Sequence, residues 1–213
     1  MKDIELTINF TDAGTPFCLI AALIYLSGFH TLSKREKQTW IVIWLNLIGD
    51  LVGFFLSKAD IETGLIYNLL LPAERAISLL IYSSASSSKN YKILFQVGIA
   101  MIVFIRIASV IIEGPLHHFQ FMANTAEGLL TAILSYVFIR HALIGKTRTT
   151  IILFAFGIAN FLYLILMASA MSAIPIAYRI DRDYSNALYG INTAAYIIWS
   201  ATLIIAILWK KKT

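Results

Sequence analysis

The 213-residue sequence is 59% hydrophobic and only 14% charged, and its mean hydropathy is +0.77. A soluble domain of ordinary composition carries about 25% charged residues, so these values exclude a soluble globular class. Apolar runs of roughly 20 residues recur along the chain, each long enough to cross a hydrocarbon core of roughly 30 Å as a helix. The net charge of +5 does not indicate a nucleic-acid partner, because the basic residues mark membrane sidedness instead.

The pattern predicts an all-α membrane protein, a bundle of seven transmembrane helices in a single domain over residues 1–213. In chain order the predicted helices cover residues 15–32, 38–57, 63–86, 92–112, 119–144, 149–172 and 185–209. The polar, acidic start "MKDIELTINFTDAG" does not have the basic segment and short apolar core of a secretory signal peptide. The single cysteine, Cys18, excludes an internal disulfide and a multi-cysteine metal site.

Lysine and arginine are distributed unevenly between the two ends of these helices. One end carries Lys34, Arg35, Lys37, Lys89, Lys92, Arg140, Lys146, Arg148, Lys210, Lys211 and Lys212, whereas the other carries Lys2, Lys58, Arg179 and Arg182. The positive-inside rule therefore predicts a multi-pass protein of the cell (inner) membrane, with its N-terminus outside and its C-terminus in the cytoplasm.

A weak internal repeat aligns residues 19–41 with residues 130–152, with matches that include Tyr25 to Tyr136 and His30 to His141. It predicts two repeat halves, 10–88 and 119–211, joined by a connecting helix at 91–113. One intervening helix makes the two three-helix units parallel, a 3+1+3 layout found in transporters whose pseudo-symmetry axis lies along the membrane normal.

Five ionisable residues fall inside the predicted spans, between the midplane and the outer leaflet. They are Asp50, Glu74, Arg75, Arg106 and Glu127. Charges at this depth cost several kcal/mol, so they normally face the bundle interior and find partners there. Three acids against two arginines leave one negative charge, which a proton or a cationic ligand would balance.

Neutral polar residues share helix faces with these charges, because offsets of three, four and seven place side chains on one side of a helix. They are Asn46 on the second helix, Asn124, Thr131 and Ser135 on the fifth, Asn160 and Tyr163 on the sixth, and Tyr189, Asn192, Tyr196 and Ser200 on the seventh. In "NLLLPAERAISLL" (68–80), Pro72 is expected to kink the third helix and to free the carbonyl of Asn68 beside Glu74 and Arg75.

These features predict an outer-leaflet polar pocket that binds a small ionic or amphipathic ligand, for transport or sensing. The candidate ligand-binding or proton-coupling residues are Asp50, Asn68, Glu74, Arg75, Arg106, Asn124, Glu127, Asn160, Asn192 and Tyr196. Two alternatives stay open. One is an intramembrane enzyme that acts on a lipid or isoprenoid, with Asp50 and Glu74 as paired acids. The other is a scaffold subunit whose buried charges fix an oligomer or bind a membrane partner.

Two family resemblances rest on quoted motifs. The run "IYNLLLPAERAISLLIY" and the stripe "ANTAEGLLTAILSYVF" are similar to small uncharacterised seven-helix membrane proteins of bacteria, which implies a fold and no activity. "PAER" (72–75) with the upstream "GD" (49–50) resembles the membrane lycopene cyclases, whose three-helix units carry a proline–x–acid–acid motif. Here Arg75 stands where the second acid belongs, and "NTAAY" in the seventh helix does not contain the motif.

No cofactor is predicted. The microbial rhodopsins need a lysine in the seventh helix for a covalent retinal, and "LYGINTAAYIIWSATLIIAILW" contains none. The seven-helix zinc hydrolases need several histidines with an acid, but His117 and His118 fall in an outer loop while His30 and His141 fall at the inner rim. Membrane lipids are the expected surroundings.

Overall fold

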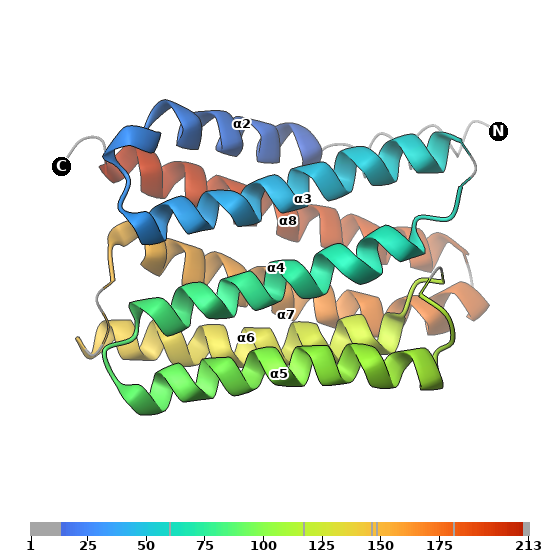
Figure 1. Cartoon of the computed structure of the whole chain (residues 1–213). Helices are drawn as coiled ribbons and strands as arrows, with labels where there is room; N and C mark the ends of the chain where they lie inside the picture. The colour runs from blue at the N-terminus through green and yellow to red at the C-terminus, as the bar shows by residue number, and fades with distance from the viewer. Residues whose placement is uncertain are drawn as a thin grey trace.

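The computed structural model describes residues 14–59, 61–116, 118–145, 147, 149–180 and 182–210. They form seven α-helices and one short 3₁₀ turn that lie side by side in a bundle (Figure 1). The elements are α2 (Gly14–Ser27), η1 (Phe29–Thr31), α3 (Lys34–Lys58), α4 (Gly64–Ala85), α5 (Lys89–Ile112), α6 (Phe121–Leu143), α7 (Ile151–Ile180) and α8 (Arg182–Lys210). Within these ranges there is no β-strand, and the predicted all-α, seven-helix class is confirmed.

Six of the helices, α3 to α8, are long and apolar enough to cross a membrane. The described part of α2 has 14 residues, about 21 Å of helix at 1.5 Å per residue. The outward face of α5 carries Phe104, Ile107 and Ile111 at 71%, 62% and 84% exposure. Contiguous apolar surface of this kind fits lipid rather than water, and the chain is a multi-pass membrane protein.

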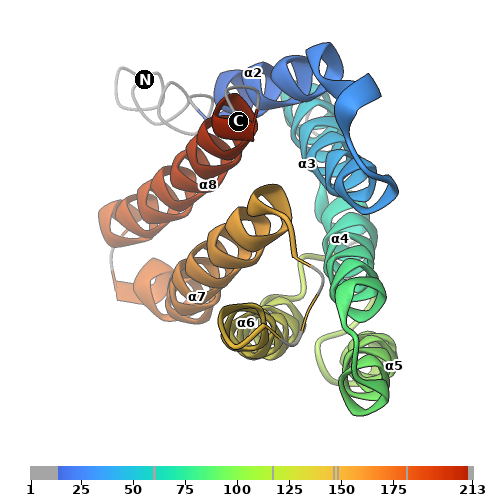
Figure 2. The ribbon, with the colours of Figure 1, turned by 90° about the vertical axis from the view of Figure 1, so that its left-hand side faces the viewer.

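Viewed end-on, α2, α3, α4 and α5 follow one another along one side of the bundle, and α8, α7 and α6 form the other side (Figure 2). The arrangement closes because α2 packs against α8 and α5 packs against α6. Between the two sides α4 also contacts α6, and α3 contacts α7. An aromatic core fills part of this interface, where Tyr82 stacks on Phe138 with 4.4 Å between ring centroids.

Two helix ends differ from the sequence prediction by five residues or more. The first helix ends at Ser27 rather than at 32, because Gly28 leads into the 3₁₀ turn. The sixth continues to Ile180 rather than ending at 172, and Pro175 lies inside it. Proline in a helix interior removes one backbone hydrogen bond, a loss that membrane helices tolerate where neighbours satisfy the freed group. Helix α4 likewise runs through Pro72; the kink there stays a prediction.

The N-terminal end of α3 is joined to the C-terminal end of α8. The backbone N–H of Ser33 donates to Glu36 Oε2 at 2.7 Å, and the N–H of Glu36 donates to Ser33 Oγ at 3.4 Å, which is a capping box. Lys210 Nζ, in the last turn of α8, lies 2.7 Å from the same Glu36 Oε2. One buried carboxylate thus starts α3 and holds the C-terminal helix against it.

The internal repeat stays a prediction. The two predicted halves correspond to α2–α4 and α6–α8, with α5 between them. Their helices differ in length: 14, 25 and 22 residues in the first triplet against 23, 30 and 29 in the second. Residues 10–13 and 211, at the ends of the predicted halves, lie outside the described residues, as do Lys2, His117, Lys146, Arg148, Lys211 and Lys212.

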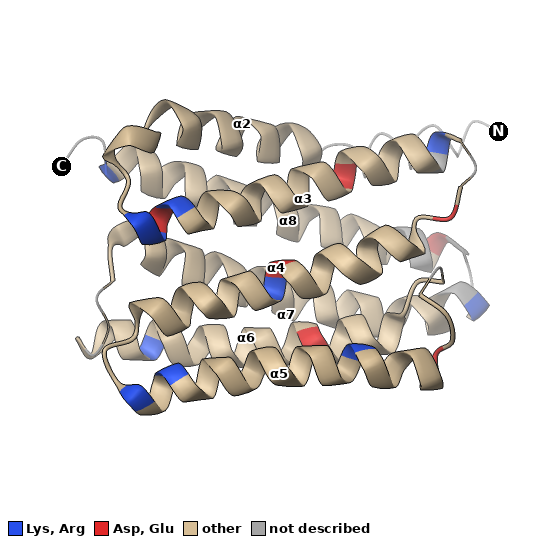
Figure 3. Ribbon diagram, in the orientation of Figure 1, with Lys and Arg blue, Asp and Glu red and all other residues tan. Residues whose placement is uncertain are grey.

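Basic residues gather at the end of the bundle where α3 and α5 begin and α8 ends, while acidic residues are more frequent at the opposite end (Figure 3). Lys34 and Lys89 open α3 and α5, and Lys210 closes α8. The alternation of helix direction brings these residues to one level, as the positive-inside argument requires. The orientation of the bundle in its membrane remains a prediction.

Labelling of single cysteines tests this orientation. In a Cys18→Ala background, we expect Glu62→Cys to react with a membrane-impermeant maleimide in intact cells, because the Glu62 side chain is 63% exposed at the predicted outer end. Lys89→Cys, which is exposed at the other end, should react only after the cells are permeabilised. The reverse pattern of labelling would show that the N-terminus faces the cytoplasm.

Candidate functional site

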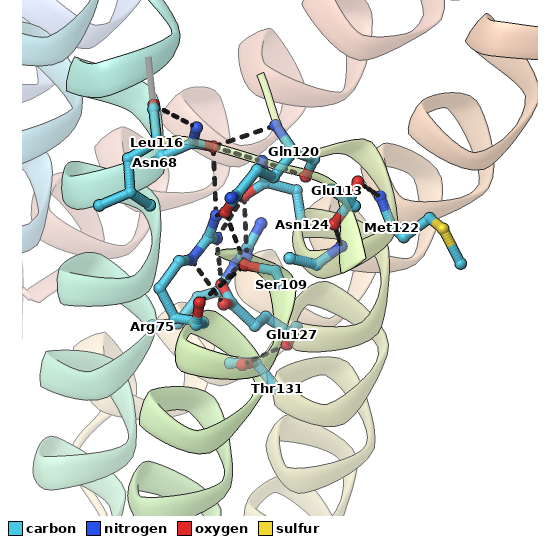
Figure 4. Close-up of polar contacts among 12 residues, drawn as sticks. Asn68, Arg75, Ser109, Glu113, Leu116, Gln120, Met122, Asn124, Glu127 and Thr131 are labelled. Atoms are coloured by element: carbon cyan, nitrogen blue, oxygen red, sulfur yellow. Dashed lines mark hydrogen bonds and ion pairs between the residues drawn. The ribbon is translucent and has the colours of Figure 1, made fainter. Parts of the chain in front are cut away.

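One glutamate binds two arginines at the centre of the candidate site (Figure 4). Glu127 on α6 accepts a hydrogen bond from Arg75 Nη1 of α4 at 2.7 Å. It also accepts two from Arg106 of α5, from Nε at 3.0 Å and from Nη2 at 2.8 Å. Such bidentate pairs are the strong form of charged hydrogen bond. The residues predicted from three separate helices therefore meet at one carboxylate.

Amide side chains complete the shell around Arg106. Its Nη1 donates to Asn68 Oδ1 at 3.1 Å and to Gln120 Oε1 at 2.9 Å, and its Nη2 donates to Asn124 Oδ1 at 3.0 Å. An arginine has five N–H donors, and all five of Arg106 are engaged once the two bonds to Glu127 are included. Arg106 thus offers no further donor to a ligand in this arrangement.

Gln120 is a member of this network that the sequence analysis missed. It precedes the first turn of α6, and its fully buried side chain also accepts from Ser109 Oγ at 2.6 Å and donates to the carbonyl of Gly114 at 2.9 Å. A signal was present in the sequence, since Gln120 lies four residues before Asn124 and seven before Glu127. That spacing extends the polar stripe of α6 by one turn.

The same network fastens the loop between α5 and α6. Asn68 Nδ2 donates to the backbone carbonyls of Leu116 and His118, at 2.8 and 2.6 Å. The carboxylate of Glu113 accepts the N–H groups of Met122 and Ala123, each at 2.8 Å, at the N-terminus of α6 (Figure 4). Negative charge is favourable at a helix N-terminus. The loop that covers Arg106 is therefore held from α4 and from its own acidic residue.

The two remaining acids lie outside this network. Among the described side chains, neither Asp50 nor Glu74 forms an ion pair with a basic group. The five charges predicted at one depth are thus divided: Arg75 and Arg106 are both used by Glu127, and two carboxyls are left. Glu74 and Arg75 are adjacent in sequence but contact different neighbours.

A second polar group surrounds these carboxyls, and we call it the acid–tyrosine group. Its members come from α3, α4, α7 and α8 and lie within electrostatic range of one another: Asn46, Asp50, Tyr67, Glu74, Tyr163 and Tyr196. Cys18 of α2 lies beside Tyr196 and Asp50. Glu74 is 4% exposed and Tyr196 is 7% exposed. The hydroxyl of Tyr196 and Oδ1 of Asn192, one turn earlier on α8, are buried and make no hydrogen bond in the part of the chain that the structure describes.

Asn160 belongs to a third set of contacts and joins neither group. It donates from Nδ2 to Ser78 Oγ and Tyr82 Oη, both at 3.1 Å, and accepts from Trp199 Nε1 at 2.6 Å. Tyr82 continues to Ser135 Oγ at 3.1 Å. Asn160 of α7 thus contacts α4 and α8 directly, and Tyr82 extends the set to α6.

A cavity of about 210 Å³ lies elsewhere, between α7 and α8. It is lined by Ile151, Ala155, Thr202, Ile205, Ala206 and Trp209. Its lining is almost entirely apolar, and none of the predicted site residues contributes to it. Within the described ranges, no three histidine, cysteine, aspartate or glutamate side chains come together as metal ligands.

Glu127→Gln should destabilise the protein strongly, because it leaves Arg75 and Arg106 charged and without a counter-ion in the interior. Removal of one partner from a buried ion pair costs about 3–5 kcal/mol. Equilibrium unfolding in detergent micelles measures the loss, and Glu62→Gln is the matched control since the 63% exposed Glu62 should change stability by less than about 0.5 kcal/mol. A Glu127→Gln protein as stable as the control would show that Glu127 does not hold the arginines.

Comparison with known proteins adds no relative to this geometry. No family model, no curated protein and no solved structure matches the chain. The resemblances to small bacterial seven-helix proteins and to lycopene cyclases therefore stay expectations from the motifs.

Proposed function

We propose that the protein binds a small ionic or amphipathic ligand within the bundle, for transport or sensing across the cell (inner) membrane. The acid–tyrosine group is the site, with Asp50 and Glu74 as the ligand- or proton-binding residues. The observation that carries this proposal is the division of charge. Both arginines at this depth are bound by Glu127, and the two other carboxyls form no ion pair among the described residues.

Uncompensated carboxyls inside a membrane are costly, and they commonly mark substrate or proton pathways. Glu74 is almost completely buried, and Asp50 is only partly accessible. A purely structural role would favour replacing such groups by apolar side chains, because lipid and the neighbouring helices supply no counter-charge. A bound proton or ligand supplies what the fold does not.

The position of the group also supports transport or sensing. Asp50 and Glu74 come from α3 and α4, on one side of the bundle, whereas Tyr163 and Tyr196 come from α7 and α8, on the other (Figure 2). A ligand bound between the two sides would contact both. Secondary transporters bind substrate at such an interface and move one side against the other.

The network around Glu127 serves as the framework in this proposal. All donors of Arg106 are engaged, so an anionic ligand there would have to displace Glu127 or the amides. We therefore assign ligand binding to the acid–tyrosine group, and we assign to the two arginines the role of holding the helices together. The proposed site is therefore smaller than the set of ten candidate residues from the sequence analysis.

Native mass spectrometry of the protein, extracted with its lipids, tests the proposal. We expect wild type and the exposed control Glu62→Gln to carry one specific molecule besides bulk lipid, and Glu74→Gln and Asp50→Asn to lose it. Uptake of that molecule by proteoliposomes would then distinguish a carrier from a receptor, and its conversion to a product would indicate an enzyme. Retention of only bulk lipid, equal in all four proteins, would favour a scaffold and overturn the proposal.

A further inference from the structure

We propose that the ligand of the acid–tyrosine group is an organic ammonium cation, a protonated amine with an apolar substituent. This inference rests on the proposed function and specifies its substrate class. It depends on three independent features of the group: its charge, its free oxygen atoms and its aromatic rings.

The charge of the group favours a cation. Asp50 and Glu74 contribute two carboxyls, and the nearest basic residue, Arg75, donates Nη1 to Glu127 at 2.7 Å and to Asn124 at 3.4 Å. Its Nη1 is therefore committed to the other network, whereas its Nε is buried and makes no hydrogen bond among the described residues. An anionic ligand would have to approach two carboxyls, whereas a cation would compensate the charge that the fold leaves.

The oxygen atoms of the group match the donors of an ammonium. Asn192 Oδ1 is buried and without a hydrogen bond among the described residues, and Tyr196 Oη forms no hydrogen bond of ordinary length there, although Asp50 and Cys18 lie within its reach. A buried polar atom costs free energy until it finds a partner. Tyr196 is 93% buried and its hydroxyl lies beside Asp50. An ammonium offers only donors, so carboxylate, amide and hydroxyl oxygens can all accept from it.

Aromatic rings line the same place. Tyr163, Tyr196 and Trp199 pack together, with ring centroids 5.9 Å apart for Tyr163 and Tyr196, 6.3 Å for Tyr163 and Trp199, and 5.8 Å for the stacked pair of Tyr196 and Trp199. The faces of such rings attract organic cations. They also give an alkyl or aryl substituent an apolar wall. The combination favours an organic ammonium over a metal ion, which would need more oxygen or nitrogen ligands and no rings.

Glycines allow the tyrosines to reach this position. A Cβ atom at Gly14 would lie 2.7 Å from Cδ1 of Tyr196, and one at Gly53 would collide with the hydroxyl of Tyr67. The backbone of α2 therefore comes close to Tyr196 at Gly14, and the backbone of α3 comes close to Tyr67 at Gly53. A side chain at either glycine would collide with the tyrosine ring as it is now placed.

Isothermal titration of the purified full-length protein with three probes of one shape tests the inference: benzylammonium, benzyl alcohol and benzoate. We expect saturable binding of benzylammonium to wild type and at least tenfold weaker binding of the neutral and anionic probes. Asp50→Asn should weaken benzylammonium at least tenfold and Tyr196→Phe several-fold. The controls are Glu62→Gln and Tyr136→Phe, whose side chains are exposed at 63% and 52%; both should bind as wild type does.

Benzoate or benzyl alcohol binding as tightly as benzylammonium would overturn the inference, and so would undiminished binding by both Asp50→Asn and Tyr196→Phe. Thermal unfolding shows whether each variant is folded. If a variant is not folded, the comparison of the three probes on the wild-type protein alone tests the inference. The proposed binding site and the proposed ligand class can be refuted separately. If native mass spectrometry finds a neutral or anionic molecule that the Glu74→Gln protein does not bind, the binding site is supported and the ammonium ligand is refuted.

Discussion

The bond of one buried glutamate to two arginines is the constraint on which the half of the bundle near the α5–α6 loop depends. Glu127 is completely buried and Arg75 is 1% exposed, and a membrane offers neither group an alternative partner. The helices that carry these residues, α4, α5 and α6, must therefore approach one another closely enough for the ion pairs to form. Gly128, the next residue, makes the approach possible on one side: a Cβ atom there would lie 3.3 Å from Ala168 Cβ and 3.8 Å from Arg75 Nη2.

This arrangement has a consequence for the charges that remain. A glutamate shared by two arginines is an overall positive group, and the amides of Asn68, Gln120 and Asn124 stabilise it without neutralising it. The two carboxyls of Asp50 and Glu74 lie on the other side of α4, in surroundings of tyrosines. The structure therefore separates a positively charged group around Glu127 from a group of two carboxyls that form no ion pair among the described residues.

The two ends of the bundle are closed by different chemistry. At the end near the α5–α6 loop, amide and carboxylate side chains bind backbone groups, with Asn68 and Glu113 as the main contributors. At the other end, the ion pair of Glu36 with Lys210 joins α3 to α8. Between them the acid–tyrosine group and the contacts of Asn160 occupy the interior.

The sequence by itself determined the membrane class, the number of helices and the position of each ionisable residue along its helix. These properties depend only on the composition of each segment and on the spacing of residues along it, and both can be read directly from the sequence. Only the tertiary structure decided which carboxyl binds which arginine, that Gln120 belongs to the same network, and that Asp50 and Glu74 are left without an ion pair among the described residues. Those outcomes depend on how each helix is rotated about its axis and on which neighbour it meets. Apolar residues on nearly every face of a membrane helix leave that rotation undetermined until the helices pack.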